Sequence, residues 1–407
     1  MPVHYHWWTP PQTRNTPTGR HGTFPFTGHR DFLPAIGLAR PRPARPPPEW
    51  LPMADVESTR SATLGSRAVL LTVAEVVAET EDTHSLVLTI PDAHRHRFAY
   101  RPGQFLTVRV PSTRTGSVVR CYSLASSPHA DERPKVTIKR TDGGYASNWL
   151  CDNVFAGDTI EVLPPSGRFT PGGLDGDFLL WAAGSGITPV ISILKSVLTA
   201  GTGRVILCYA NRDEKSVIFA AELRELAARY ADRLTVLHWL ESVQGLPTRA
   251  QLGGFAKLVN GYESFICGPA PYMAVVTKAL SEAGVPRERV HSEVFESLSG
   301  DPFSAPPPDA IADDGELDAA EAQIELDGQA YTVRWPRSRN LVDTMLAAGI
   351  DVPYSCREGN CGSCAATVLE GEVQMGESTL LEAQDVADGL FLACQARPVT
   401  DEVKIEF

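Results

Sequence analysis

The spacing of apolar residues changes along the chain, and each spacing covers a separate stretch. From Ala68 to Phe169, short alternating runs are separated by turn sequences such as Arg101-Pro102-Gly103. This pattern predicts an antiparallel β-barrel of about a hundred residues, with one helix near Ser147 to Phe155. The expected strands are Val69–Val77, Ser85–Ile90, Gln104–Val110, Val119–Leu124, Lys135–Arg140 and Thr159–Leu163.

After Gly173, strongly apolar strands alternate with longer stretches of helical periodicity. That alternation predicts an α/β domain whose parallel sheet is covered on both faces. The expected strands are Phe178–Ala183, Val205–Tyr209, Leu234–Leu240 and Phe265–Gly268, and the expected helices are 190–199, 217–231, 248–259 and 270–283.

The C-terminal stretch begins with a hairpin pattern, Gln323–Leu326 and Gln329–Trp335, whose turn is Asp327-Gly328. A helix is expected at Asn340 to Ala348, with Asn340 as its N-cap and Gly349 as its stop. A cysteine-rich loop follows. These elements predict a small α+β domain.

The ends and joints of this pattern set the domain boundaries. Residues 1–66 contain 12 of the 32 prolines and no apolar periodicity, so we expect a disordered leader. A second stretch, Leu298 to Ala320, is Pro-rich and then acidic, which is typical of a linker. The predicted division is leader 1–66, barrel 67–172, α/β domain 173–297, acidic linker 298–322 and α+β domain 323–407.

Composition and charge exclude several classes of protein. No run approaches the roughly 20 apolar residues that a membrane-spanning helix requires, and the N-terminus lacks the pattern of a signal peptide. We therefore expect a cytoplasmic protein, whose eight cysteines are thiols or metal ligands rather than disulfides. The last 112 residues hold 22 acidic residues against six basic ones. Such a surface repels nucleic acid and favours a basic protein partner.

The strongest chemical signal is the spacing of four cysteines. Cys356, Cys361 and Cys364 form the pattern C-x4-C-x2-C, and Cys394 follows 30 positions later. This is the spacing of a plant-type [2Fe–2S] cluster, in which four thiolates hold two irons. Gly359, Gly362 and Ser363 are small enough for backbone N–H groups to approach the cluster. A structural zinc site and unrelated buried thiols are the alternatives.

Three Gly- or Arg-containing motifs have the composition of phosphate and flavin sites. Arg120 to Leu124 ends an expected strand, and Gly143 to Ser147 precedes the barrel helix. Together they offer an Arg for a pyrophosphate, an aromatic plane and a helix N-terminus. Gly184-x-Gly186-x-x-Pro189 follows the next strand, and Thr188-Pro189 is expected to start a helix with an N-cap hydroxyl. The alternatives are an ordinary surface charge for Arg120, a core aromatic for Tyr122 and a tight turn without a ligand for Gly184 to Pro189.

Taken in order, these motifs resemble the ferredoxin–NADP reductase superfamily. The matching patterns are R-x-Y-S-L, G-G-x-x-S, G-S-G-I-T-P and C-G-P-x-x-M. With the cysteine-rich domain added, residues 67–407 look like a one-chain reductase component of a bacterial oxygenase. The stretch 291–303 is similar to reductases of 3-ketosteroid 9α-hydroxylases, and the overall order is similar to phenylacetyl-CoA epoxygenase reductases. Neither family has the Pro-rich leader.

The resemblance implies roles for particular residues. Ser123, Cys267 and Glu293 are expected at the reacting centre. FAD is expected rather than FMN, bound by Arg120, Tyr122, Ser123, Leu124, Ile138, Lys139, Gly144, Ser147 and Phe295. NADH or NADPH is expected at Gly184, Gly186, Thr188, Pro189, Arg212 and Gly268, and the cluster at Cys356, Cys361, Cys364 and Cys394.

These cofactors together predict a path for electrons. A nicotinamide gives two electrons as hydride, whereas a [2Fe–2S] cluster accepts one at a time, and a flavin bridges that mismatch. The predicted order is NAD(P)H, FAD, [2Fe–2S] and then a terminal oxygenase of the Rieske or di-iron type. The alternatives are a free-standing NAD(P)H oxidase or quinone or ferric reductase, and an iron–sulfur redox sensor without catalysis.

Overall fold

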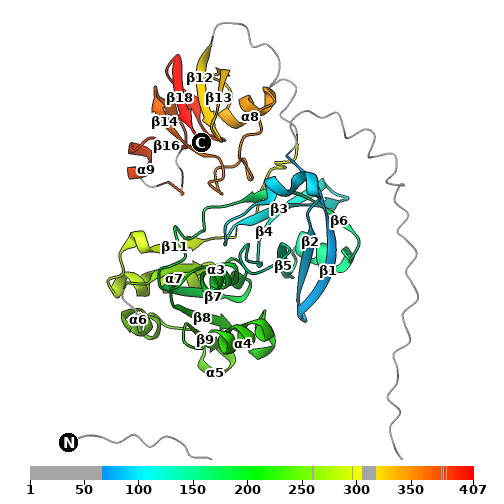
Figure 1. Cartoon of the computed structure of the whole chain (residues 1–407), viewed down its shortest axis with the longest axis vertical. Coiled ribbons are helices and arrows are strands. Elements are labelled where there is room, and N and C mark those ends of the chain that lie inside the picture. Colours follow the sequence, from blue (N-terminus) through cyan, green and yellow to red (C-terminus); the bar gives the residue numbers. More distant parts are fainter. Residues whose placement is uncertain are drawn as a thin grey trace, which may run out of the picture. The chain divides into compact units, whose positions relative to one another are not determined.

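The computed structural model describes residues 67–258, 261–295, 297–304, 318–376, 378, 380–381 and 383–407. The chain divides into two units, Met1–Ser58 and Thr59–Phe407, and every described residue belongs to the second unit. The predicted leader and most of the predicted linker lie outside the described residues. Three large sheets, which we assign to a first, second and third domain, follow one another along the chain (Figure 1), and a two-stranded sheet, β15-β17, belongs to the third domain.

The first domain is a six-stranded antiparallel sheet in the order β4-β3-β6-β1-β2-β5. A bridge between Leu124 and Val136 joins the end of β4 to β5, so the sheet curls back on itself. The six predicted strands are present, with ends shifted by at most three residues. The strands are β1 Val69–Thr80, β2 Thr83–Thr89, β3 Phe105–Ser112, β4 Gly116–Ser123, β5 Lys135–Lys139 and β6 Thr159–Ser166.

One helix, α2 (Tyr145–Asn153), packs in this domain and begins two residues before the predicted start. The buried Leu150 of α2 joins an apolar cluster with Leu71 and Val73, which face inward from β1. Gly103 shows why the predicted turn needs glycine: its φ is +93°, and a Cβ would lie 1.9 Å from the carbonyl oxygen of Phe169. The alternation of apolar residues therefore identifies a sheet with one buried face.

The second domain is a five-stranded parallel sheet in the order β11-β10-β7-β8-β9. Alternate residues of β7 face opposite layers: Leu180 packs with α3 and α4, and Trp181 packs with α6 and α7. Helices therefore cover both faces, as predicted. The strands are β7 Phe178–Ala183, β8 Val205–Asn211, β9 Leu234–Leu240, β10 Glu263–Cys267 and β11 Val290–Glu293, and the helices are α3 Ile187–Ala200, α4 Ala220–Arg229, α5 Glu241–Gln244, α6 Arg249–Leu258 and α7 Ala270–Glu282.

Strand β11 has no counterpart in the predicted elements. It has four residues and only Val290 is buried, so its periodicity is too short to recognise. Its position depends on pairing with β10, where Cys267 lies opposite Glu293. A strand of this kind is defined by its neighbour in the sheet rather than by its own apolar pattern.

The third domain is a mixed five-stranded sheet in the order β13-β12-β18-β14-β16, in which β12 and β18 run parallel. The predicted hairpin is present: Asp327 and Gly328 have φ of +52° and +73°, as a tight two-residue turn requires. Its elements are β12 Ala319–Leu326, β13 Gln329–Pro336, α8 Leu341–Ala347, β14 Ala365–Glu370, β15 Val373–Gln374, α9 Ala383–Ala387, β16 Leu390–Leu392, β17 Arg397–Pro398 and β18 Glu402–Glu406.

Two predictions about this domain have clear outcomes. The side chain of Asn340 caps α8 by accepting a hydrogen bond from the backbone N–H of Asp343 at 2.8 Å, as predicted. Strand β12 begins at Ala319, inside the range expected as linker, because the small buried residues Ala320 and Ala322 gave little apolar signal. Phe303, also placed in the linker, is buried in the apolar cluster of the third domain.

No helix among the described residues has the length and hydrophobicity to cross a membrane.

Candidate redox site

The four cysteines predicted as metal ligands lie together in the third domain. Three of them belong to the loop between α8 and β14, and Cys394 follows β16. The sulfur of Cys356 interacts with those of Cys361 and Cys394, and the sulfur of Cys394 interacts with that of Cys364. The fold therefore joins two segments that are 30 residues apart into one group of four sulfur atoms.

Each of these sulfur atoms also faces a hydrogen-bond donor. Donors of this kind stabilise thiolate charge and orient metal ligands. The spacing of the cysteines gave no indication of Gln395, whose side-chain amide reaches the last sulfur. The contacts are Glu358 N–H to Cys356 Sγ at 3.4 Å, Ser363 Oγ to Cys361 Sγ at 3.1 Å, Cys394 N–H to Cys364 Sγ at 3.4 Å and Gln395 Nε2 to Cys394 Sγ at 3.4 Å.

The backbone of the loop needs its small residues. Gly359 and Gly362 have φ of +82° and +70°, and a Cβ on Gly362 would lie 2.6 Å from Cδ of Arg168 in the first domain. Among the described residues, no three His, Cys, Asp or Glu side chains surround one point as ligands of a single ion would. A [2Fe–2S] cluster places two thiolates on each iron, so the four sulfur atoms and their donors fit such a group.

The predicted flavin residues lie on β4, β5 and the start of α2. Ser123 is buried at the end of β4, Tyr122 is half-buried against the core, and the guanidinium of Arg120 donates to the carbonyl of Val119 at 2.7 Å. On β5, Ile138 is buried, while the ammonium group of Lys139 pairs with Asp82 at 2.8 Å. Lys139 can therefore face a flavin only through its backbone.

The N-terminus of α2 has the chemistry of a phosphate site. Gly144 is the N-cap and provides no side-chain cap, so the first N–H groups of the helix stay available to an anion. The hydroxyl of Ser147 accepts from the N–H of Thr141 at 3.1 Å. A Cβ on Gly144 would lie 2.9 Å from Cβ of Thr141, so this close approach requires glycine. These residues fit the phosphate groups of a flavin.

The predicted nicotinamide residues lie at the ends of β7 and β10. Gly184 has φ of +52°, and a Cβ on Gly186 would lie 2.1 Å from the carbonyl oxygen of Cys267. Only glycine permits this close approach between the turn after β7 and the turn after β10. Gly268 contributes from the second turn, because a Cβ there would lie 2.9 Å from Cβ of Ala183.

One detail of the nicotinamide prediction was wrong. Thr188 does not cap α3: the helix begins at Ile187 with Gly186 as N-cap, and the hydroxyl of Thr188 donates to the carbonyl of Ser185 at 3.0 Å. Pro189 is consequently the third residue of the helix rather than the first. The short 3-10 turn formed by Gly184–Gly186 leads directly into α3, so the helix starts before the threonine.

Residues of the first and second domains meet at the expected reacting centre. The hydroxyl of Ser123 donates to Oε2 of Glu293 at 3.3 Å, and Cys267 lies beside Glu293 in the β10–β11 register. Burial raises the pKa of Glu293 to about 8, against the lowering effect of the Ser123 hydrogen bond. Burial also raises the pKa of Cys267 well above its usual range, with Glu293 adding to it. Both groups are therefore held in their neutral forms near pH 7.

Two further predicted residues lie toward the edge of this region. Phe295 follows β11 and is 48% exposed, so it can cover a ligand that lies on the site. Arg212 lies after β8, and its guanidinium pairs with Asp82 of the first domain at 3.6 Å. The neighbouring Asp213 caps a short 3-10 turn by accepting from Ser216, which occupies its carboxylate.

A contact between the first and third domains had no sequence signal. The hydroxyl groups of Thr107 and Ser355 are 2.5 Å apart, and Oγ1 of Thr107 is also 3.5 Å from the sulfur of Cys121. Ser355 immediately precedes Cys356, and Cys121 lies between Arg120 and Tyr122. Burial raises the pKa of Cys121 to about 12, so it remains a neutral thiol. The cysteine loop therefore contacts β3, at the position where this strand pairs with β4 and its predicted flavin residues.

Three family profiles match consecutive parts of the chain. An oxidoreductase FAD-binding domain matches residues 70–170, an oxidoreductase NAD-binding domain matches residues 180–278 and a 2Fe-2S iron-sulfur cluster binding domain matches residues 324–399. The three matches fall on the first, second and third domains, respectively.

Individual relatives match across all three domains. The ferredoxin reductase component of 3-ketosteroid-9-alpha-monooxygenase from Rhodococcus rhodochrous is 64% identical over 343 residues, which cover 84% of this chain and 98% of the relative. A component of the 1,2-phenylacetyl-CoA epoxidase from Escherichia coli is 32% identical over 362 residues, covering 83% and 97%. The solved structure of phthalate dioxygenase reductase, described as a modular structure for electron transfer from pyridine nucleotides to [2Fe–2S], shares the fold with a TM-score of 0.50 and 24% identity, covering 84% of this chain and 98% of that one.

Proposed function

This chain belongs to the family of ferredoxin reductase components of monooxygenases, and we propose that it passes electrons from NAD(P)H through FAD and one [2Fe–2S] cluster, singly, to a terminal oxygenase. The observation that carries this proposal is the contact between Thr107 and Ser355, which places the four-cysteine loop against β3, the strand paired with β4 and its predicted flavin residues. When bound, the flavin accepts hydride from the nicotinamide and releases electrons one at a time.

The residues of the chain bind and orient the cofactors. Arg120 and the N-terminus of α2 would hold the pyrophosphate of FAD, which gives the longer cofactor two anchoring points and favours it over FMN. Tyr122 would pack on the ring system. The turn at Gly184 to Gly186, with Thr188 and Pro189 at the start of α3, would hold the nicotinamide cofactor by its pyrophosphate, and Arg212 and Gly268 would line the same site.

The reacting centre requires alignment rather than acid–base chemistry. Ser123 and Glu293 are hydrogen-bonded across the boundary of the first two domains, which brings their backbones together at the place where the two rings would meet. Cys267 is buried and neutral, so it provides a small wall beside the nicotinamide without adding charge. Together these residues define the distance between the two ligands.

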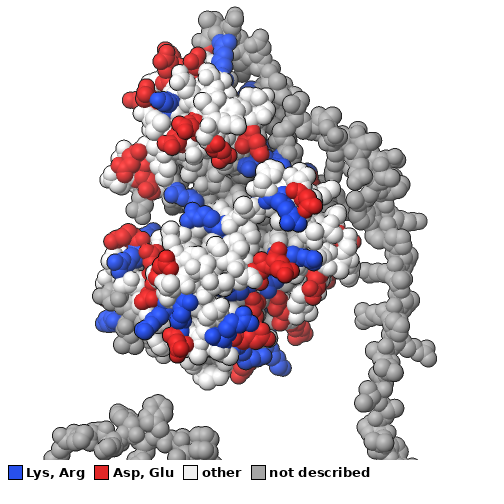
Figure 2. Space-filling view, viewed as in Figure 1, with Lys and Arg blue, Asp and Glu red and all other residues white. Residues whose placement is uncertain are grey.

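The terminal oxygenase is the acceptor that the relatives indicate. Relatives with 55–64% identity are named as components of 3-ketosteroid-9-alpha-monooxygenase. We therefore extend to this chain an oxygenase partner of the Rieske or di-iron type that acts on a 3-ketosteroid. Acidic side chains spread over the third domain with few basic ones among them (Figure 2), which favours a basic docking face on the partner. The eight free cysteines suit a reducing, cytoplasmic location.

A single substitution separates the two halves of the electron path. We expect Cys361→Ala to abolish NADH-dependent reduction of cytochrome c, because the cluster loses one of its four ligands. Bleaching of the flavin by NADH should remain, because the first and second domains are unchanged. Cys208→Ala, which removes a buried thiol far from the cluster, is the matched control and should retain both reactions. Stopped-flow absorbance follows both steps, and loss of flavin bleaching in Cys361→Ala would contradict this division.

A second measurement tests the oxygenase proposal against the free-standing oxidase. NADH consumption by the purified protein should be slow in air and should rise when a 3-ketosteroid oxygenase and its steroid are added together. Fast NADH consumption whose rate does not change when the oxygenase is added would support the free-standing oxidase instead.

A further inference from the structure

Helix α3 presents a polar stripe to the first domain. Ser192, Lys195 and Ser196 are spaced so that they share one side of the helix. Such a stripe on a surface helix normally faces solvent, yet here the two serines are fully buried and Lys195 is only 3% exposed. A buried ammonium group is energetically costly unless it is paired with an opposite charge, so Lys195 must have carboxylate partners.

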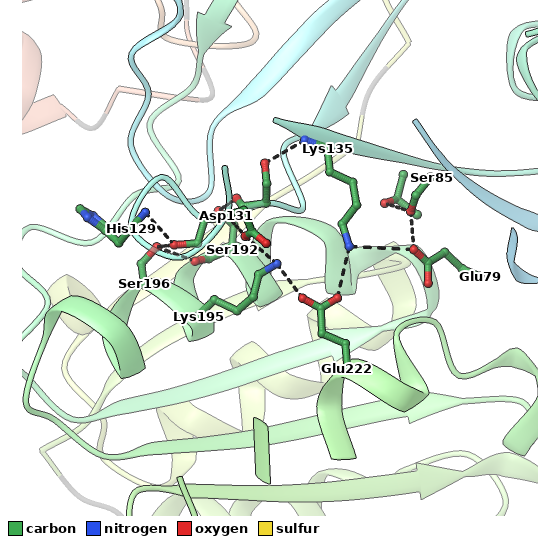
Figure 3. Close-up of polar contacts among 12 residues, drawn as sticks. Glu79, Ser85, His129, Asp131, Lys135, Ser192, Lys195, Ser196 and Glu222 are labelled. Atoms are coloured by element: carbon green, nitrogen blue, oxygen red, sulfur yellow. Dashed lines mark hydrogen bonds and ion pairs between the residues drawn. The ribbon is translucent and has the colours of Figure 1, made fainter. Parts of the chain in front are cut away.

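Each residue of the stripe contacts one loop of the first domain, residues 126–131, and Ser192 also accepts a hydrogen bond from the N–H of Gly103 at 3.4 Å. The hydroxyl of Ser192 donates to the carbonyl of Ser126 at 2.6 Å, and the hydroxyl of Ser196 lies 2.7 Å from that of Ser127. The ammonium group of Lys195 pairs with Oδ2 of Asp131 at 2.9 Å. Figure 3 shows Lys195 between this loop and α4, where it meets a second carboxylate.

That second carboxylate extends the contact to another strand of the first domain. Oε1 of Glu222 on α4 lies 2.8 Å from Nζ of Lys195, and its Oε2 lies 3.2 Å from Nζ of Lys135 on β5. Nζ of Lys135 also lies 4.0 Å from Oε1 of Glu79 (Figure 3). The same ammonium group lies 4.7 Å from the centre of the Phe219 ring. Charges of alternating sign therefore run from Asp131 through Lys195, Glu222 and Lys135 to Glu79.

The contact between the 126–131 loop and α3 lies next to both halves of the proposed redox site. The 126–131 loop begins three residues after Ser123, at the expected reacting centre. Ser192 lies four residues after Thr188, in the helix that starts at the nicotinamide turn. The stripe therefore joins the loop that follows the predicted flavin strand to the helix that starts at the predicted nicotinamide turn.

We propose that Lys195 is a positioning residue for hydride transfer: by holding Asp131 and Glu222 together, it sets the orientation of α3, and with it the nicotinamide, relative to the flavin strand. The inference rests on the proposed function. Buried ion pairs contribute little net stability compared with apolar contacts, but they define one register between surfaces, because any displacement leaves a charge unpaired. Hydride transfer is sensitive to displacements of about 1 Å, so a fixed register has a direct kinetic value.

The test is Lys195→Met, which removes the charge and keeps a similar length, measured on the full flavin-loaded protein. The observed rate constant of flavin reduction at saturating NADH should fall about tenfold or more. The dissociation constant for NADH should change by less than about twofold, because its proposed binding turns lie within the second domain. A larger primary isotope effect with NADH deuterated at C4 should accompany the loss, since hydride transfer becomes slower than binding.

Further variants distinguish positioning from general stability. Asp131→Asn should cause a similar defect from the other domain, and the double variant should be no worse than either single variant, because both remove one contact. Lys195→Arg, which keeps the charge, should recover part of the rate. Arg249→Met, which breaks an exposed pair with Glu282 inside the second domain, is the control and should leave the rate unchanged.

The outcomes separate the two levels of inference. An unchanged rate constant per bound flavin in Lys195→Met, even with a lower melting temperature, would show that the network is structural only and would overturn the inference. If NADH does not bleach the flavin of the unmodified protein, the proposed function itself fails. Reduced rates that combine additively in the double variant would also count against a shared positioning contact.

Discussion

The first domain meets its two neighbours through contacts of different kinds. Toward the second domain it uses the stripe of α3, whose ammonium group is almost entirely hidden from solvent although its partners Asp131 and Glu222 are 31% and 28% accessible. Toward the third domain the buried contacts are the hydroxyl pair of Thr107 and Ser355 and the apolar residues Val119 and Leu163. The ion pairs around them are partly exposed, as in the pair of Arg109 with Asp301, whose side chains are 27% and 26% accessible.

This difference matches the demands of the two electron-transfer steps. Hydride transfer requires two rings in fixed contact, and a buried ammonium group, which is costly to separate from its carboxylates, favours such a contact. We expect the third domain, which gives single electrons to a partner protein, to leave its resting contact more readily. Partly exposed ion pairs are worth at most about 1 kcal/mol each, so they permit such movement.

The largest effect is expected at the hydroxyl pair between the first and third domains. Thr107→Val keeps the shape of the side chain but leaves the buried hydroxyl of Ser355 without this partner, at a cost of about 1 to 3 kcal/mol. We expect slower transfer of electrons from flavin to cluster with unchanged reduction of the flavin by NADH. Stopped-flow absorbance at flavin and cluster wavelengths measures both steps.

The control for this substitution lies within the first domain. Thr137→Val removes a similar buried hydroxyl pair, with Ser85 at 2.8 Å, but does not touch the third domain. Equal slowing of cluster reduction in the two variants would mean that general loosening of the first domain, rather than the contact with Ser355, controls the step.

A smaller, pH-dependent effect is expected at the other boundary. The pKa of Glu293 is about 8 in the folded protein and near 4.5 in an unfolded chain. Between these values the folded state keeps the proton that the unfolded state releases, so this group makes folding less favourable as pH rises from about 4.5 to about 8. The melting temperature of Glu293→Gln should therefore decline less than that of the unmodified protein between pH 6 and pH 8.

Thermal unfolding at several pH values provides the measurement for Glu293. Glu288→Gln, at an exposed position in the same domain, is the matched control and should follow the unmodified protein. Parallel curves for all three proteins would show that Glu293 titrates at an ordinary pKa in the folded state.

The smallest effect is expected at the rim of the third domain. Asp301 accepts from Arg109 at 2.8 Å and from the hydroxyl of Ser117 at 2.9 Å, and both contacts are partly exposed. Asp301→Asn should lower stability by about 1 kcal/mol or less at 0.1 M salt. At 1 M salt, where the Debye length is only about 3 Å, the difference should shrink. If the loss of stability in Asp301→Asn is the same at 1 M salt, the pair of Arg109 and Asp301 behaves as a buried contact instead.

Short sequence signals predicted a large part of this architecture because their causes are local. The spacing of Cys356, Cys361 and Cys364 reflects one loop wrapped round one group, and the Asp327-Gly328 turn reflects backbone angles that few residues adopt. The cap at Asn340 is likewise a contact over three residues. The family resemblance drawn from such motifs is confirmed by relatives that match all three domains.

The remaining features were decided by tertiary structure. Thr107 and Ser355 are 248 residues apart and meet only when two domains dock. Lys195 is the one charged residue of the apolar helix α3, and its pairing with Asp131 depends on a loop of another domain. A residue's own neighbours determine turns, caps and ligand spacing, whereas the pairing of buried charges depends on which surfaces the fold brings together, and no local pattern records that.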